Sequence, residues 1–238
     1  MGMFCFQCQE TAGGKGCTVK GVCGKPEEVA NLQDLLIYVL KGISDVVVKG
    51  KLDIKTIKNI NHELTNSLFM TITNANFDPE AIEEKIRKML SLRDNLRQQV
   101  KADNLHDAAT FELKTKEEMI EKSRSVGVLS ILPEDIRSLK EMIKYGLKGM
   151  AAYAEHASNL GKEDMEIYKF IYEALAESLD ESLTADELVK LTLKTGEYGV
   201  KVMALLDEAN TSRYGNPKIT KVNIGVRTNP AILISGHD

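Results

Sequence analysis

The stretch VANLQDLLIYVLKGI, residues 29–43, decides the fold class of this chain. Its apolar residues recur three or four positions apart, which places them on one face of an α-helix. Pro26 suits the first turn of such a helix, and the carboxylates of Glu27 and Glu28 favour its N-terminal end, where the helix dipole is positive. The stretch therefore predicts an amphipathic helix that begins near residue 26 and turns one face to a core.

The same periodicity returns along most of the chain between short breaks. The sequences Asp78-Pro79-Glu80 and Pro133-Glu134-Asp135 are typical helix starts, and Thr184-Ala185-Asp186-Glu187 is a capping box. Only five prolines interrupt a composition rich in helix-forming residues. We predict further helices over residues 54–72, 78–101, 114–123, 133–160, 162–179 and 184–209.

The two helical halves resemble each other. Residues 38–43, YVLKGI, match residues 145–150, YGLKGM, and the helix start at 78–82 corresponds to 184–188. Both offsets are about 106 residues, as expected of a duplicated three-helix bundle. Chance similarity between amphipathic helices is the alternative. We predict a first bundle over residues 26–101, a connector over 102–132 and a second bundle over 133–213.

Residues 214–238 differ in character from the helices. The sequence YGNP at 214–217 stops the last helix, and VNIGV at 222–226 alternates as a β-strand does. The apolar run AILIS at 231–235 is typical of a buried parallel strand. We therefore predict the first strands of an α/β domain, with His237 at the carboxyl end of a strand, where such sheets bind ligands.

All four cysteines lie within a loop at residues 1–25, in the pattern Cys5-x2-Cys8-x8-Cys17-x5-Cys23. Four thiolates this close in sequence can enclose one iron–sulfur cluster, which is the interpretation we favour. Two disulfides are a second interpretation, and a reducing cytosol argues against them. A zinc site is the third, although such sites usually join two closely spaced cysteine pairs across a longer insert.

Other residues of the loop suit a bound cluster. Glycines permit positive φ angles and a close backbone approach, and their amides can point at cluster sulfides. Lys15, Lys20 and Lys25 add positive charge near an anion, although solubility alone also explains them. The histidines elsewhere, His62, His106 and His156, lack metal-ligand spacing and are expected to be surface or core residues. The loop glycines are Gly13, Gly14, Gly16, Gly21 and Gly24.

The composition excludes several classes of function. The chain has 238 residues, a formal net charge of -4 and no Trp, so it lacks the basic and aromatic surface of a nucleic-acid-binding protein. Its longest apolar run, residues 35–40, is far shorter than the ~20 residues that span a membrane. The first cysteine is already at position 5, which leaves no room for a signal peptide before it. We therefore expect a cytoplasmic protein without nucleic-acid or membrane partners.

The loop and its flanks resemble a known family. Residues 3–11, MFCFQCQET, and 16–25, GCTVKGVCGK, look like the N-terminus of the hybrid cluster proteins, also called prismane proteins or hydroxylamine reductases. Residues 31–36, NLQDLL, and 214–217, YGNP, continue the resemblance. It reaches residues 234–238, ISGHD, and so spans the whole chain.

The resemblance implies an architecture and two metal centres. The family has a helical first domain of two three-helix bundles followed by two α/β domains, an arrangement shared with nickel carbon monoxide dehydrogenases. The x2-x8-x5 spacing belongs to the subgroup with a [4Fe–4S] cubane, whereas a longer spacing belongs to a [2Fe–2S] subgroup. Gly236-His237-Asp238 matches the segment that supplies a histidine to a second, hybrid [4Fe–2O–2S] cluster. The implied cubane ligands are Cys5, Cys8, Cys17 and Cys23.

The resemblance also implies an activity, the reduction of hydroxylamine to ammonia and water, and possible reduction of nitric oxide to nitrous oxide. The cubane would relay electrons from an external redox protein to the hybrid cluster, and no residue of this chain is assigned a catalytic role. Family members are over twice this length, so we expect a piece of a longer oxidoreductase that is inactive alone. The alternatives are a stand-alone electron-transfer module and a purely structural helical domain.

Overall fold

The computed structural model describes residues 2–72 and 76–233, and within these ranges it contains helices and no β-strand. The prediction of a mainly helical chain is therefore confirmed. Short 3-10 turns lie at Ala12–Gly14, Ile54–Thr56 and Val128–Ser130. The helices are α1 (Glu27–Lys49), α2 (Lys58–Ile72), α3 (Pro79–Gln99), α4 (Asp107–Thr110), α5 (Lys116–Ser125), α6 (Glu134–Asn159), α7 (Met165–Glu177) and α8 (Ala185–Tyr214).

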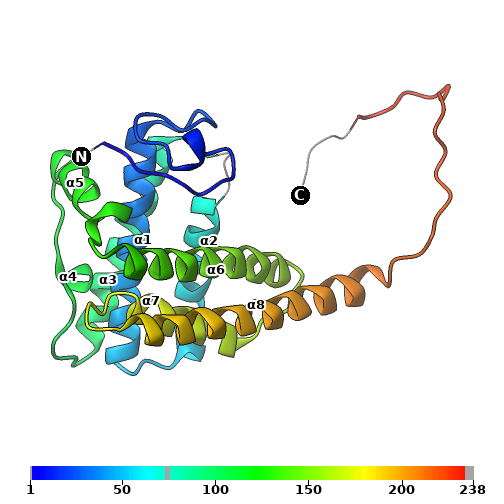
Figure 1. Cartoon of the computed structure of the whole chain (residues 1–238). Coiled ribbons are helices and arrows are strands. Elements are labelled where there is room, and N and C mark those ends of the chain that lie inside the picture. Colours follow the sequence, from blue (N-terminus) through cyan, green and yellow to red (C-terminus); the bar gives the residue numbers. More distant parts are fainter. Residues whose placement is uncertain (1, 73–75, 234–238) are drawn as a thin grey trace.

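Helix α1 is the centre of the fold. It packs against α3, α7, α4 and α5, so its buried residues extend beyond the single apolar face that the sequence predicts. Helices α6 and α8 run side by side across α1 and α2, and α8 extends past the other helices (Figure 1). The capping box predicted at Thr184 is confirmed, because the Glu187 amide donates to the Thr184 hydroxyl and the Glu187 carboxylate accepts from the Thr184 amide.

The two predicted bundles pack directly on each other. Helix α1 contacts α7, and α2 contacts α6. One apolar core passes through both halves and includes Leu40 of α1, Leu64 of α2, Ile143 of α6 and Phe170 of α7. The division of the chain into separate bundles stays a prediction, since the contacts describe one shared core.

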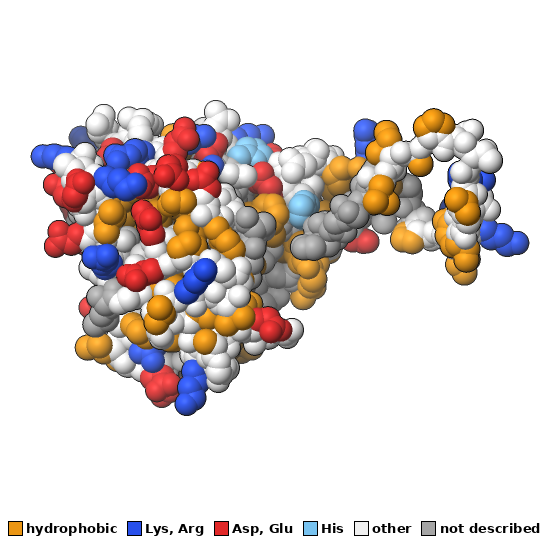
Figure 2. Space-filling model, turned by 90° about the horizontal axis from the view of Figure 1, so that it is seen from above, with side chains coloured by type: hydrophobic (Ala, Val, Ile, Leu, Met, Phe, Trp, Pro, Cys, Tyr) orange, Lys and Arg blue, Asp and Glu red, His pale blue; other side chains and the backbone are white. Residues whose placement is uncertain are grey.

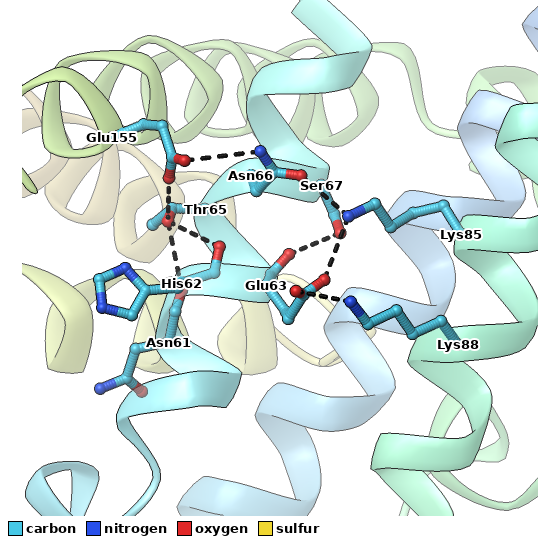
Figure 3. Close-up of polar contacts among 9 residues, drawn as sticks. All are labelled: Asn61, His62, Glu63, Thr65, Asn66, Ser67, Lys85, Lys88 and Glu155. Atoms are coloured by element: carbon cyan, nitrogen blue, oxygen red, sulfur yellow. Dashed lines mark hydrogen bonds and ion pairs between the residues drawn. The ribbon is translucent and has the colours of Figure 1, made fainter. Parts of the chain in front are cut away.

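Helix α2 is held between α3 and α6 by polar side chains (Figure 3). The Glu63 carboxylate accepts hydrogen bonds from Lys85 Nζ at 3.1 Å and Lys88 Nζ at 2.7 Å, both on α3. On the opposite side, Thr65 Oγ1 donates to a Glu155 carboxylate oxygen of α6 at 3.3 Å. These contacts orient the three helices, while the apolar core supplies most of the stability.

The connector contains the helix α4, which the sequence analysis missed. Arg93 of α3 is fully buried beneath it and donates to the carbonyl oxygens of Ala108 at 3.0 Å and Phe111 at 2.6 Å. Its guanidinium carbon lies 4.7 Å from the centroid of the Phe111 ring. His106, which carried no signal in the sequence, caps α4 by accepting a hydrogen bond from the Ala108 amide at 3.0 Å.

The strand predicted at residues 222–226 is not confirmed, and the segment after α8 extends away from the helical body (Figure 2). In the described part of the chain after α8, residues 215–233 form no helix or strand, and the side chains of Val222, Ile224 and Val226 are exposed. A strand requires backbone hydrogen bonds from a neighbouring strand, and no described residue supplies them. Of the second predicted strand, residues 231–233 are also irregular, and its end lies outside the described residues, as does His237.

Gly42 of α1 provides a test of the packing of α4 against α1. A Cβ atom at Gly42 would overlap the Ala108 carbonyl of α4, whereas its counterpart in the repeat, Gly149, has open space at that position. We expect Gly42→Ala to lower the free energy of unfolding by about 1–3 kcal/mol through overpacking. Gly149→Ala should raise it by about 0.5–1 kcal/mol, because glycine weakens a helix interior. Urea unfolding followed by circular dichroism measures both, and equal effects would contradict the close approach of α4 to α1.

Candidate metal centre at the cysteine loop

Two of the four cysteines are joined through their backbones. The Cys5 amide donates to the Cys17 carbonyl at 3.0 Å, and the Cys17 amide donates to the Cys5 carbonyl at 2.7 Å. The Thr11 hydroxyl also donates to the Cys5 carbonyl, at 3.1 Å. This reciprocal pair brings two thiols separated by eleven residues of chain to neighbouring positions in the loop at the N-terminal end of α1 (Figure 1).

The Cys17 thiol lies in an environment that favours its thiolate. Its side chain is 5% exposed, and the Ala12 amide donates to Sγ at 3.5 Å. Hydrogen bonds from the backbone amides of Ala12 and then Val22 hold the pKa of Cys17 below its ordinary value. Because the thiolate is the form that binds metal, these amides prepare Cys17 as a ligand.

Gly16 is required by the geometry beside Cys17. It has a φ of 136°, and a Cβ atom there would lie 2.6 Å from Cε2 of the Phe4 ring. Only glycine accepts both the positive φ and the close approach of the ring. Gly16, one of the glycines predicted to permit a tight loop, therefore lies directly before Cys17, where the chain enters its pairing with Cys5.

The remaining cysteines have more access to solvent. Cys8 is half-buried and Cys23 is exposed, and all four thiols are free. In residues 2–72 and 76–233, no three His, Cys, Asp or Glu side chains converge as they would around a single metal ion. The donor set nevertheless suits a cubane, because each thiolate of such a site binds a different iron and the four sulfurs need not surround one point.

Gln7, between two cysteines, ties the loop to the helices, a role that its sequence position does not reveal. Its Nε2 donates to the carbonyl of Ile72 at the end of α2, at 2.8 Å. Its Oε1 accepts from Lys148 Nζ of α6 at 2.9 Å. Next to it, the rings of Phe6 and Tyr145 meet edge to face with centroids 5.7 Å apart. The loop is thereby anchored to both halves of the core.

Two buried lysines flank this anchor. Lys25, expected to serve charge or solubility, is 1% exposed and donates to Gln33 Oε1 at 2.8 Å, whereas Lys15 and Lys20 are exposed. Burial, followed by repulsion from Lys144, lowers the pKa of Lys148 to about 7. The sequence does contain a signal that could have pointed to Lys148: a lysine interrupts the apolar pattern at the same place in YVLKGI and YGLKGM.

Gln7→Ala tests the anchor. Removing both hydrogen bonds should raise the rate of amide hydrogen exchange in residues 2–25 by about tenfold or more, because each such bond contributes roughly 0.5–1.5 kcal/mol. Gln9→Ala is the matched control, since Gln9 is exposed and lies in the same loop. Hydrogen exchange read by mass spectrometry measures the difference. If both variants exchanged equally, Gln7 would not hold the loop.

Comparisons with known proteins identify the family of this chain. The chain matches the model of the Prismane/CO dehydrogenase family over residues 3–238. Over its full length it is 70% identical to a hydroxylamine reductase of Acetivibrio thermocellus, of which it covers 44%. It is 56% identical to one of Clostridium perfringens and 54% identical to one of Bacteroides fragilis, again over its full length and covering 45% and 44% of them. None of the helices in the described ranges combines the length and hydropathy needed to cross a bilayer. The chain spans less than half the length of these relatives, and it belongs to the Prismane/CO dehydrogenase family.

Proposed function

We propose that this chain is the cysteine-bearing helical part of a hydroxylamine reductase and that its loop holds one [4Fe–4S] cluster. The observation that carries the proposal is the Cys17 thiol, paired by its backbone with Cys5 and hydrogen-bonded by the Ala12 amide. The high identity to proteins named hydroxylamine reductase supports the activity of the whole protein. The proposed ligands are Cys5, Cys8, Cys17 and Cys23.

The residues around the thiols have distinct proposed roles. The Ala12 and Val22 amides stabilise the negative charge on Cys17. Gln7 and Lys148 keep the loop fixed on α2 and α6, so that the sulfurs change position little. When bound, an iron–sulfur cluster at these sulfurs supplies one-electron transfer.

The exposed side of the loop is the proposed docking site for an external electron donor. Cys23 is exposed there, together with the apolar side chains of Val19 and Val22. Transient redox encounters use small contact areas, and exposed apolar side chains next to a ligand give a partner protein a short path to it. We expect the donor to be a cytoplasmic redox protein.

The chemistry on nitrogen is assigned to a second centre. We propose His237 as a ligand of a hybrid [4Fe–2O–2S] cluster. When bound in the whole protein, that cluster would supply the two electrons that, with two protons, convert hydroxylamine to ammonia and water, and nitric oxide would be a second substrate. No cysteine follows Cys23 in this sequence, so the other ligands must come from further residues of the whole protein. In this proposal the loop carries electrons and does not contact the substrate.

The cluster can be tested on the chain itself. After anaerobic assembly with iron and sulfide, we expect equal amounts of iron and labile sulfide and, after reduction, the paramagnetic signal of a reduced cubane. Cys17→Ser should lose most of the iron, because serine replaces the thiolate that the amides stabilise. Val19→Ser, an exposed change in the same loop, should keep it. Zinc bound without labile sulfide would contradict the cluster and favour a structural site.

A second experiment tests the proposal that hydroxylamine is reduced at the hybrid cluster of the whole protein and not at the cysteine loop. With a chemically reduced viologen as electron source, the cluster-loaded 238-residue chain should not reduce hydroxylamine, whereas the whole protein should. Ammonia release measures both. Turnover by the chain alone would place the chemistry at the cysteine loop and contradict the relay role, and a whole protein that leaves hydroxylamine unchanged would contradict the proposed activity.

A further inference from the structure

A cavity of about 570 Å³ lies away from the cysteine thiols, between α1, α6 and the connector. Ile37, Val126 and Ile136 form an apolar part of its wall, and the amines of Lys41, Lys140 and Lys144 line another part. A cavity of this size with an apolar wall and a few polar groups is typical of small-molecule sites. Nothing in the proposed electron relay uses it.

Most of the charged side chains around the cavity have partners. Lys140 Nζ donates to the Asp180 carbonyl at 2.7 Å, and Lys144 forms an ion pair with Glu141. Lys122, at the connector side, is paired with Asp107 at 2.6 Å. These lysines are therefore already compensated by oxygen atoms of the chain.

Lys41 differs from them. It is half-buried, and among the residues that the structure describes its amine forms no hydrogen bond or ion pair; the carboxyl groups of Glu141 and Asp34 act on it only through longer-range attraction. Burial, and then repulsion from Lys144, lowers its pKa to about 8, so at pH 7 most molecules still carry a charge there. Burial also raises the pKa of Asp34, the carboxyl group in the same wall, against the attraction of Lys144.

The repeat provides an internal comparison. Lys41 and Lys148 occupy the same position in YVLKGI and YGLKGM, and both amines have a lowered pKa, although Lys148 is buried and Lys41 is half-buried. Lys148 has an acceptor, Gln7 Oε1, at 2.9 Å. Lys148 thus has the Gln7 oxygen as its acceptor, whereas Lys41 has the open cavity instead. An anionic ligand oxygen at this place would give the half-buried Lys41 amine a charge-assisted hydrogen bond, which is stronger than one between neutral groups.

We propose that this cavity binds a small monocarboxylate, with its carboxylate at the Lys41 amine and its apolar body against Ile37, Val126 and Ile136. One amine without a hydrogen-bond partner matches one negative charge, and the carboxyl groups of Asp34, Glu141 and Glu181 in the lining disfavour a ligand with more than one, such as a phosphate or a dicarboxylate. The apolar wall favours an organic anion over an inorganic one. The inference does not depend on the cluster, because none of these residues belongs to the cysteine loop.

The site predicts a dependence of affinity on pH. The site binds a charged carboxylate to a protonated amine, so affinity should be nearly constant between about pH 5.5 and pH 7, where both charges are present, and fall about tenfold per pH unit above pH 8. The other titratable and charged groups that line the cavity are Asp34 and Tyr38 of α1, Lys140, Glu141 and Lys144 of α6, and His106, Lys122 and Glu181 of the connecting segments.

Calorimetric titration of the chain with benzoate tests the proposal. We expect saturable binding of benzoate at pH 7 and at least tenfold weaker binding of benzamide, which has the same shape without the charge. Lys41→Met should weaken benzoate binding by about tenfold or more, the usual loss for a hydrogen bond to a charged group. Lys190→Met, at an exposed lysine of α8 outside the cavity, should leave it unchanged.

Three results would overturn the proposal: no saturable benzoate binding, equal affinity for benzoate and benzamide, or equal affinity of the wild-type chain and Lys41→Met. Circular dichroism of Lys41→Met confirms that it folds. If it does not fold, the benzamide comparison and the pH profile of the wild-type chain decide the question. Affinity unchanged between pH 7 and pH 10 would then exclude Lys41 as the binding group.

Discussion

Helix α1 is buried along most of its 23 residues, and every neighbouring element takes its position from that burial. Removing its leucine, isoleucine and valine side chains from water stabilises the fold by roughly 1.5–3 kcal/mol for each one. The cysteine loop continues directly into this helix, with Lys25 buried at the junction. This buried helix begins at Glu27, only Lys25 and Pro26 away from the Cys23–Gly24 pair, so the loop starts from a fixed point.

The duplicated lysine links the two functional regions to this core. The Lys148 amine donates to Gln7 and holds the loop, whereas Lys41 lines the cavity and has no acceptor among the described residues. Each amine has a lowered pKa because burial disfavours its charge. The same lysine position, repeated in α1 and α6, thus anchors the loop in α6 and has a proposed binding role in α1. The difference between the two is the carboxamide oxygen of Gln7, which only Lys148 contacts.

At the cysteines, local and distant contacts have different effects. The hydrogen bonds between Cys5 and Cys17 and the amide at the Cys17 sulfur form within the loop, and they determine the chemistry of the thiol. The contacts of Gln7 with Ile72 and Lys148 come from residues 65 and 141 positions away, and they determine where the loop lies. The proposed electron relay would need both, because a cluster ligand must be ionised and must also stay in place.

What the sequence by itself determined follows from short-range physics. The periodicity of residues 29–43, the capping box at Thr184 and the cysteine spacing each depend on neighbours a few positions apart, so the helices and the candidate ligands could be predicted. The strand predicted at 222–226 is not confirmed, because pairing needs a second strand. The burial of Arg93 and Lys25, the anchor at Gln7 and the cavity at Lys41 were decided by the tertiary structure alone, since each depends on which distant surface meets that side chain when the helices pack.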